Sequence, residues 1–361
     1  MDIYEPSEDS YLLAGCVKNY AFGSVLDMGT GSGILAKTAS ESKKVSIVIA
    51  ADINPAAKKH LGKMKFVQSD LFSKITGKFD TIIFNPPYLP QDKGIEDSAL
   101  YGGKKGYETI ERFLNGCNAH LKKDGIILLL FSNLTNKERI EEIIANNCLE
   151  FEEIARKKLE MMETLYVYKI EKTGLLKELE EKKITRVMKF AKGNRGIIYT
   201  GLLGRKKIAI KAKNPKSDAP ERIANEAKWL IRLNEKGIGP KHLFHAGNKY
   251  LAYEFAEGNL LKDAKITKKI LAEILRQCRT LDTMNVSKEE MTRPYSHAVI
   301  GKKIVMLDFE RCTYSENPQN VTQFCQFIAK SHKNKEEIRN AAQKYSRDKS
   351  DKNFEKIVRL I

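Results

Sequence analysis

The sequence predicts an α/β fold with a doubly wound sheet in the first half of the chain, followed by an α+β domain in the second half. In the first half, apolar runs of strand length alternate with segments of helix length. Glycines and polar residues stand where these runs end. A sharp rise in positive charge then separates the two halves.

The first apolar run, residues 25–28, leads into a glycine-rich turn and a helix from Ile34. Glycines allow a close approach of the backbone to a ligand. The next run, 45–51, ends at Asp52, which lies 19 residues after Gly33 and can accept both hydroxyls of a ribose. This pattern predicts a site for a nucleoside-containing cofactor, contacted in the turn by Asp27, Gly29, Gly31 and Gly33.

The third run, 65–68, leads to Asp70 and Leu71, and the carboxylate of Asp70 can accept a hydrogen bond from an adenine amine. The fourth run, 79–84, leads into Asn85-Pro86-Pro87-Tyr88. A turn rich in proline is one explanation for that tetrapeptide. The tetrapeptide follows a glycine turn and two acids, each at the end of a successive strand. This succession favours a cofactor site with a catalytic loop over a simple turn.

The tetrapeptide suits the alkylation of a planar nitrogen. The side-chain carbonyl of Asn85 and the backbone carbonyl of Pro86 can accept the two N–H groups and aim the nitrogen lone pair at a methyl group. Tyr88 can pack its ring against the planar substrate. We therefore predict Asn85, Pro86 and Tyr88 as the catalytic residues, with Asn85 also beside the cofactor.

These motifs resemble those of class I S-adenosylmethionine-dependent methyltransferases, and within them the HemK/PrmC family that methylates a glutamine of translation release factors. Relatives use the same tetrapeptide on adenine N6 or guanine N2. Residues 4–13 and 101–107 resemble the short archaeal and eukaryotic HemK type. Over residues 1–170 the resemblance implies S-adenosylmethionine as cofactor, a class I release factor as substrate and a small zinc-binding activator as partner.

Three alternatives stay open at this point. An RNA or DNA N-methyltransferase fits the same loop, and so does a protein lysine methyltransferase. In the N-terminal segment, Ser7 and Asp9 either only cap the first helix or also act beside the cofactor.

The two halves differ strongly in charge. Residues 1–171 contain 22 Lys and Arg against 24 Asp and Glu, whereas residues 172–361 contain 41 against 22. The net charges of −2 and +19 favour contact of the second half with ribosomal RNA or tRNA, although a solubilising surface is the simpler explanation. We expect the domain boundary at 171/172, in a short polar linker at 171–174.

Composition predicts a soluble, cytoplasmic protein, because the chain shows no charged-then-apolar leader and its apolar runs have strand length. The six cysteines form no Cys-x-x-Cys pair. We therefore expect reduced thiols and neither disulfides nor a zinc site.

The second half contains a different phosphate-binding pattern. Gly193 and Gly196 mark a hairpin that can close over a triphosphate, and Lys211 stands on the apolar strand 207–211. Glu226, 15 residues later on a predicted helix, is placed to pair with Lys211. An acid, Asp308, follows the apolar run 304–307.

Over residues 185–330 this pattern resembles small protein kinases of the RIO and KEOPS-kinase sort. The resemblance implies ATP and Mg²⁺, with Asp308 as a metal ligand. No His-Arg-Asp triplet precedes Asp308, so the resemblance places Glu290 at the catalytic aspartate and His297 at the metal-binding asparagine, seven residues apart where kinases have five. A pseudokinase or a binding module without activity stays open, with Glu290 as an ordinary exposed glutamate and His297 as a core histidine.

Overall fold

The structure, a computed structural model, describes residues 3–91, 101–160, 162–193, 196–214 and 222–361. The chain forms two compact units. The first comprises Met1–Lys189 with Leu202–Gly204, and the second comprises Phe190–Gly201 with Arg205–Ile361. The first unit therefore extends beyond the expected boundary at 171/172.

The first unit is built on a seven-stranded sheet in the order β3-β2-β1-β4-β5-β7-β6. The pairs from β3 to β5 are parallel, and β7 runs antiparallel to both β5 and β6. This is the mixed, Rossmann-like sheet of class I methyltransferases, so the predicted fold of this half is confirmed. The strands are β1 (Gly23–Met28), β2 (Val45–Asp52), β3 (Lys65–Gln68), β4 (Phe79–Phe84), β5 (Leu121–Ser132), β6 (Leu149–Lys158) and β7 (Thr164–Lys172).

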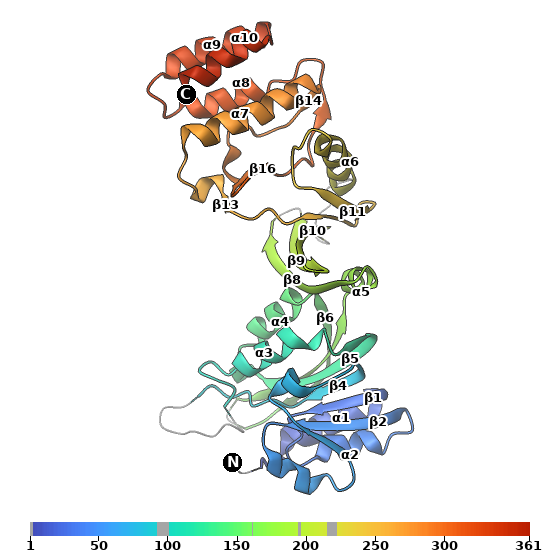
Figure 1. Cartoon of the computed structure of the whole chain (residues 1–361). Coiled ribbons are helices and arrows are strands. Elements are labelled where there is room, and N and C mark those ends of the chain that lie inside the picture. The colour runs from blue at the N-terminus through green and yellow to red at the C-terminus, as the bar shows by residue number, and fades with distance from the viewer. Residues whose placement is uncertain (1–2, 92–100, 161, 194–195, 215–221) are drawn as a thin grey trace. The chain divides into compact units, whose positions relative to one another are not determined.

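Helices cover both faces of this sheet (Figure 1). Side chains alternate between the faces of a strand, so Ile83 packs into the core with α1 and α2, whereas its neighbour Phe84 faces α3. The rings of Phe84 and Phe113 of α3 lie 4.4 Å apart. On that second face, Tyr168 donates its hydroxyl to Glu141 of α4 at 2.7 Å. The helices are α1 (Glu8–Tyr20), α2 (Ile34–Ser40), α3 (Glu108–Cys117) and α4 (Lys137–Asn146).

The prediction of a polar linker at 171–174 is wrong. Lys172 ends β7 with its side chain fully buried. Its ammonium donates to the carbonyl of Leu121 at 2.9 Å and to both carboxylate oxygens of Glu180 at 2.6 and 2.7 Å. A buried charge is tolerated when it is paired in this way. The ion pair fastens α5 (Gly174–Glu181) to the first unit.

The second unit contains a five-stranded sheet in the order β11-β12-β10-β9-β8, whose last two strands contribute residues to both units. Helix α6 packs against this sheet, and α7 to α10 form a helical part together with short strand pairs (Figure 1). The unit is thus an α+β fold. The main elements are β8 (Ile184–Lys192), β9 (Gly196–Leu203), β10 (Lys206–Lys213), α6 (Arg222–Asn234), β11 (His242–Ala246), β12 (Tyr250–Glu254), α7 (Lys268–Thr283), β16 (Ile304–Met306), α8 (Asn320–Ala329), α9 (Lys335–Arg347) and α10 (Asp351–Leu360).

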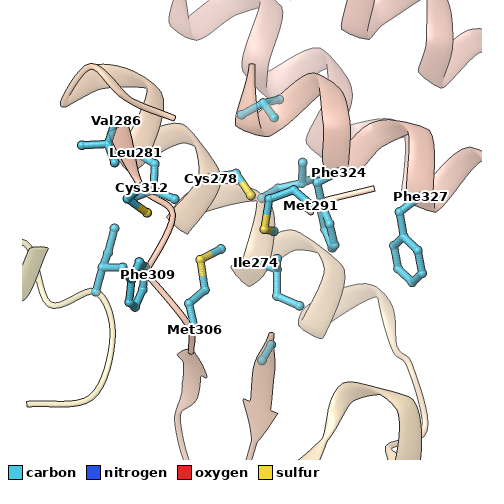
Figure 2. Close-up of a cluster of buried hydrophobic side chains, with 14 of the residues drawn as sticks. Ile274, Cys278, Leu281, Val286, Met291, Met306, Phe309, Cys312, Phe324 and Phe327 are labelled. Carbon is cyan, nitrogen blue, oxygen red and sulfur yellow. The ribbon is translucent and has the colours of Figure 1, made fainter. Parts of the chain in front are cut away.

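The helical part has a continuous apolar core between α7, α8 and the segment after β16. Figure 2 shows the side chains of Met306, Phe309 and Cys312 within this core. They flank Asp308 in the sequence, so the backbone around that acid is anchored on both sides. The basic C-terminal helices also contribute, since Tyr345 of α9 is fully buried and donates to Asp282 at 3.0 Å. The basic C-terminal helices therefore contribute to the core of this unit as well as to its surface.

All six cysteines are buried and belong to no disulfide. Among the helices of the described residues, none combines the length and the apolar character needed to cross a membrane.

Candidate active site

A cavity of about 280 Å³ opens where β1, β2 and β4 of the first unit end. The glycine turn, the acids and the Asn-Pro-Pro-Tyr loop meet there, although they are far apart in the sequence. The structure brings together most of the predicted residues, namely Gly29, Gly31, Asp52, Asp70, Leu71, Asn85, Pro86 and Tyr88.

Asp52 lies at the end of β2 and faces this cavity. One carboxylate oxygen accepts from the backbone N–H of Gly31 at 2.9 Å, and the other accepts from that of Asn54 at 2.8 Å. A carboxylate oxygen has two lone pairs, so both oxygens keep acceptor capacity for ligand hydroxyls. Asp70 also lines the cavity, but its carboxylate forms an ion pair with Arg112 of α3 at 2.6 Å.

Asp27 and Gly33 do not line this cavity but stabilise the glycine turn that does. Asp27 is fully buried and accepts from the hydroxyl of Thr30 at 2.6 Å and from the backbone N–H of Ala36 at 3.0 Å. Burial raises the pKa of the Asp27 carboxyl to about 7. Gly33 has φ +75°, and a Cβ there would lie 2.7 Å from the side chain of Leu61. Both residues hold the turn in place.

Asn85 is oriented by an acid from the first helix. Its side-chain nitrogen donates to Asp9 at 3.0 Å, and Asp9 is only 5% exposed. The other oxygen of Asp9 accepts from the backbone of Ser10 at 2.6 Å and from the hydroxyl of Tyr4 at 3.2 Å. The carbonyl oxygen of Asn85 is buried and has no hydrogen-bond partner in the described part of the chain. It is therefore available to a ligand N–H.

The structure bears on both interpretations of the N-terminal segment. Ser7 is the residue before α1, but its side chain makes no capping hydrogen bond, so the capping interpretation fails for that side chain. Asp9 lines the cavity, and its role beside the cofactor stays a prediction.

Two glycines hold the Asn-Pro-Pro-Tyr loop by close backbone contact. The N–H of Gly102 donates to the carbonyl of Leu89 at 3.0 Å. A Cβ on Gly102 would lie 2.4 Å from the carbonyl oxygen of Pro87, and one on Gly106 would lie 2.5 Å from that of Tyr88. Side chains at these positions would therefore push the loop away. This contact explains why the glycine segment follows the tetrapeptide.

Comparison with known proteins agrees with this geometry. The Methyltransferase small domain family matches residues 6–159. A Methanocaldococcus jannaschii protein named as a putative protein N5-glutamine methyltransferase is 40% identical over 157 residues, which are 39% of this chain and 79% of that protein. The chain belongs to the HemK family of S-adenosylmethionine-dependent methyltransferases.

Two further proteins match a similar share of the chain at lower identity. Human methyltransferase HEMK2 is 30% identical over 172 residues, which are 41% of this chain and 80% of the human protein. A solved structure of the E. cuniculi Mtq2–Trm112 complex is described as responsible for methylation of the termination factor eRF1. Its matched chain aligns over its whole length with 48% of this chain, at 27% identity and a TM-score of 0.42.

The residues of the HemK-type cavity fit S-adenosylmethionine, which supplies an electrophilic methyl group when bound. The glycine turn offers backbone N–H groups, and Asp52 offers a carboxylate for ribose hydroxyls. Asn85 and the buried Pro86 stand at the same cavity with acceptor carbonyls. The chain can therefore bind a nucleoside cofactor and orient a planar nitrogen beside it.

Replacing Asp52 by alanine is expected to weaken S-adenosylmethionine binding by about 2 kcal/mol, because charge-assisted hydrogen bonds to the ribose are lost. Calorimetric titration measures this affinity. Asp124→Ala, which removes an exposed carboxylate of the same unit, serves as the control. Unchanged affinity in a folded Asp52→Ala protein would remove Asp52 from the cofactor site.

A second polar cluster lies in the second unit around Lys211 of β10. Its ammonium lies 2.7 Å from Glu226 of α6, 3.1 Å from Asp308 and 3.0 Å from Glu310. Burial lowers the pKa of Lys211, but the three carboxylates outweigh it and raise that pKa well above its ordinary value. Glu310, which the sequence did not indicate, is 8% exposed and also pairs with Arg222 at 3.1 Å.

Glu290 and His297 lie beside this cluster. The Nε2 atom of His297 is 2.9 Å from Glu290, and its Nδ1 atom is 3.8 Å from Asp308. Glu290 also approaches Arg311 at 3.3 Å. Glu290 and Asp308 have φ of 71° and 63°, a region that non-glycine residues seldom occupy and that is enriched at functional sites. The buried ammonium of Lys288 donates to the backbone carbonyl of Asp308.

Of the hairpin predicted to cover a triphosphate, the structure describes Gly193 and Gly196. The N–H of Gly193 donates to the carbonyl of Gly196 at 2.9 Å, and residues 194–195 lie outside the described part of the chain. The cavity beside Asp308 and His297 measures about 10 Å³. The polar residues predicted for nucleotide and metal are thus adjacent, with little open space between them.

Proposed function

We propose that the first unit methylates the side-chain nitrogen of a glutamine, and that this glutamine belongs to the Gly-Gly-Gln loop of a class I release factor. One observation carries the proposal. The nitrogen of the Asn85 side chain donates to Asp9, and the carbonyl oxygen has no hydrogen-bond partner among the described residues, so this oxygen is left to accept from a substrate N–H. A primary amide has two N–H groups to offer to such acceptors.

In this reaction the protein acts mainly by positioning the amide nitrogen that accepts the methyl group. An amide nitrogen shares its lone pair with the neighbouring carbonyl and is a weak nucleophile. Accepting its N–H groups at Asn85 and at the Pro86 carbonyl holds the nitrogen in one orientation and stabilises the positive charge that develops on it. No basic side chain is needed before methyl transfer.

A labelling experiment tests the acceptor. The full chain is incubated with S-adenosylmethionine carrying a radioactive methyl group, together with a release factor and bulk RNA. We expect label in the release factor as N5-methylglutamine, and loss of this label when the Gly-Gly-Gln glutamine is replaced by alanine. Label in RNA bases would support a nucleic-acid methyltransferase held by the basic half, and label in methyl-lysine would support a lysine methyltransferase.

We also propose a small zinc-binding activator protein as partner. The edge strand β3 is paired on one side in the seven-stranded sheet. Ile47, on the neighbouring strand β2, is 50% exposed. A partner that adds to β3 would cover apolar surface of this kind. Co-expression with such a protein is expected to raise soluble yield and methyl transfer, and equal values without it would contradict the proposal.

For the second unit we propose ATP binding at the Lys211 cluster. The observation that favours it is the ion pair between Lys211 and Glu226 beside Asp308, since such a lysine can neutralise phosphate oxygens. Asp308 and His297 are the residues that would hold a divalent metal. Phosphoryl transfer, with Glu290 in the place of the catalytic aspartate, stays a prediction.

Nucleotide binding is tested with a fluorescent ATP analogue and the full chain. We expect Lys211→Met to abolish binding, because the cation that faces the phosphates is lost. Lys213→Met is the matched control, since Lys213 is exposed on the same strand. Equal binding in the wild type and the Lys211→Met protein would contradict the assignment.

A further inference from the structure

We infer that His297 and Asp308 bind one divalent ion through a nitrogen and an oxygen, in a site that prefers a first-row transition metal to Mg²⁺ and in which Glu290 positions His297. The inference deepens the nucleotide site proposed above. It assigns to Glu290 a supporting role in place of the catalytic role that the kinase resemblance suggests.

The two nitrogens of His297 have different surroundings. Nε2 lies 2.9 Å from a carboxylate oxygen of Glu290. Nδ1 is buried and has no hydrogen-bond partner among the described residues. The His297 side chain as a whole is only 10% exposed. A carboxylate at Nε2 holds the proton on that nitrogen and leaves the lone pair of Nδ1 free. Histidine ligands of metals usually donate their other N–H to a carboxylate in this way.

The carboxylate of Asp308 divides its two oxygens between two neighbours. Oδ1 accepts from the ammonium of Lys211 at 3.1 Å, and Oδ2 faces Nδ1 of His297 at 3.8 Å. A separation of 3.8 Å is too long for a hydrogen bond. It is shorter than about 4.2 Å, the sum of two metal–ligand bonds of nitrogen and oxygen. One ion can therefore contact both atoms.

The surroundings hold both ligands in place. Lys288 binds the backbone carbonyl of Asp308, whose φ of 63° the apolar neighbours Met306 and Phe309 help to maintain.

The ligand set indicates the metal. Mg²⁺ takes oxygen ligands almost exclusively, whereas first-row transition metals also accept imidazole nitrogen. A site with Nδ1 of His297 beside a carboxylate oxygen therefore favours a first-row transition metal over Mg²⁺. Mn²⁺ serves as the probe because it is paramagnetic.

The experiment titrates the full chain with MnCl2 without nucleotide and follows free and bound Mn²⁺ by electron paramagnetic resonance. Pulsed measurements of bound Mn²⁺ are expected to show coupling to an imidazole nitrogen, and this coupling should vanish in His297→Asn. Competition with MgCl2 should show that His297→Asn lowers the preference for Mn²⁺ over Mg²⁺ at least roughly tenfold.

A matched pair of variants tests the role of Glu290. Glu290→Gln should weaken Mn²⁺ binding about 10- to 100-fold, the usual effect of losing the carboxylate behind a histidine ligand. Glu289→Gln should leave Mn²⁺ affinity unchanged. Both glutamates pair with Arg311, Glu289 at 3.2 Å, but the one that contacts His297 is Glu290. Thermal unfolding shows whether each variant is folded.

The inference is overturned if the wild type binds no Mn²⁺, if bound Mn²⁺ shows no nitrogen coupling, or if folded Glu290→Gln keeps full affinity. These outcomes are separate from failure of the nucleotide proposal. Binding of the ATP analogue without nitrogen coupling overturns the metal assignment alone, and nitrogen coupling without nucleotide binding overturns ATP binding alone.

Discussion

Replacing Asn85 by alanine is expected to lower kcat/KM for methyl transfer at least roughly a hundredfold while the affinity for S-adenosylmethionine stays within about twofold of the wild type. The variant removes the carbonyl that orients the acceptor nitrogen. It leaves Asp52 and the glycine turn intact. Methyl incorporation into the release factor and calorimetric titration of the cofactor measure the two quantities.

A second variant tests the orientation of Asn85 without removing it. In Asp9→Asn the carboxylate becomes an amide that presents either a donor or an acceptor to Asn85, so the Asn85 side chain loses its single orientation. We expect an intermediate loss, about tenfold. A fall in cofactor affinity as large as the fall in rate would show that Asp9 and Asn85 serve binding and not acceptor orientation.

Gly102→Ala is expected to reduce methyl transfer about as strongly as Asn85→Ala, although position 102 contributes no functional group. Its Cβ would lie 2.3 Å from the carbonyl oxygen of Gly106 and 2.4 Å from that of Pro87. Backbone atoms cannot yield without moving the loop, so we also expect a loss of about 1–3 kcal/mol in the free energy of unfolding. Activity and denaturant unfolding together report both effects.

The matched control is Gly174→Ala. Gly174 begins α5, and a Cβ there meets no atom within 4 Å. This variant should keep the wild-type activity and stability. Full activity in Gly102→Ala would mean that the loop does not depend on the close contact that the structure shows.

Much of the first unit is predictable because its strands are short, apolar and separated by clear turns. The fourth apolar run of the sequence, 79–84, coincides with β4. Strand β5 begins at Leu121, ahead of the apolar residues 126–131, because the charged residues 122–124 continue the strand while their side chains remain exposed. A charged run between apolar residues is easily mistaken for a turn.

The partners of the site residues were less predictable. The pair Asp9–Asn85 joins positions 76 residues apart. Glu310 and Lys211 are 99 residues apart. Contacts of this kind arise from the fold and leave no spacing signal in one sequence. Lys211 and Glu226 were predictable because a strand and the next helix bring them together within 15 residues.

The buried ion pair of Lys172 and Glu180 bears on how a two-part gene of this kind can be divided. A break in the coding sequence immediately after β7 would leave an ammonium in an apolar interior without its carboxylate. Such a fragment would be selected against as unstable. Gene fission, or exchange of the second half between lineages, is therefore expected to occur beyond α5, so that the methyltransferase carries this helix with it wherever it is found alone.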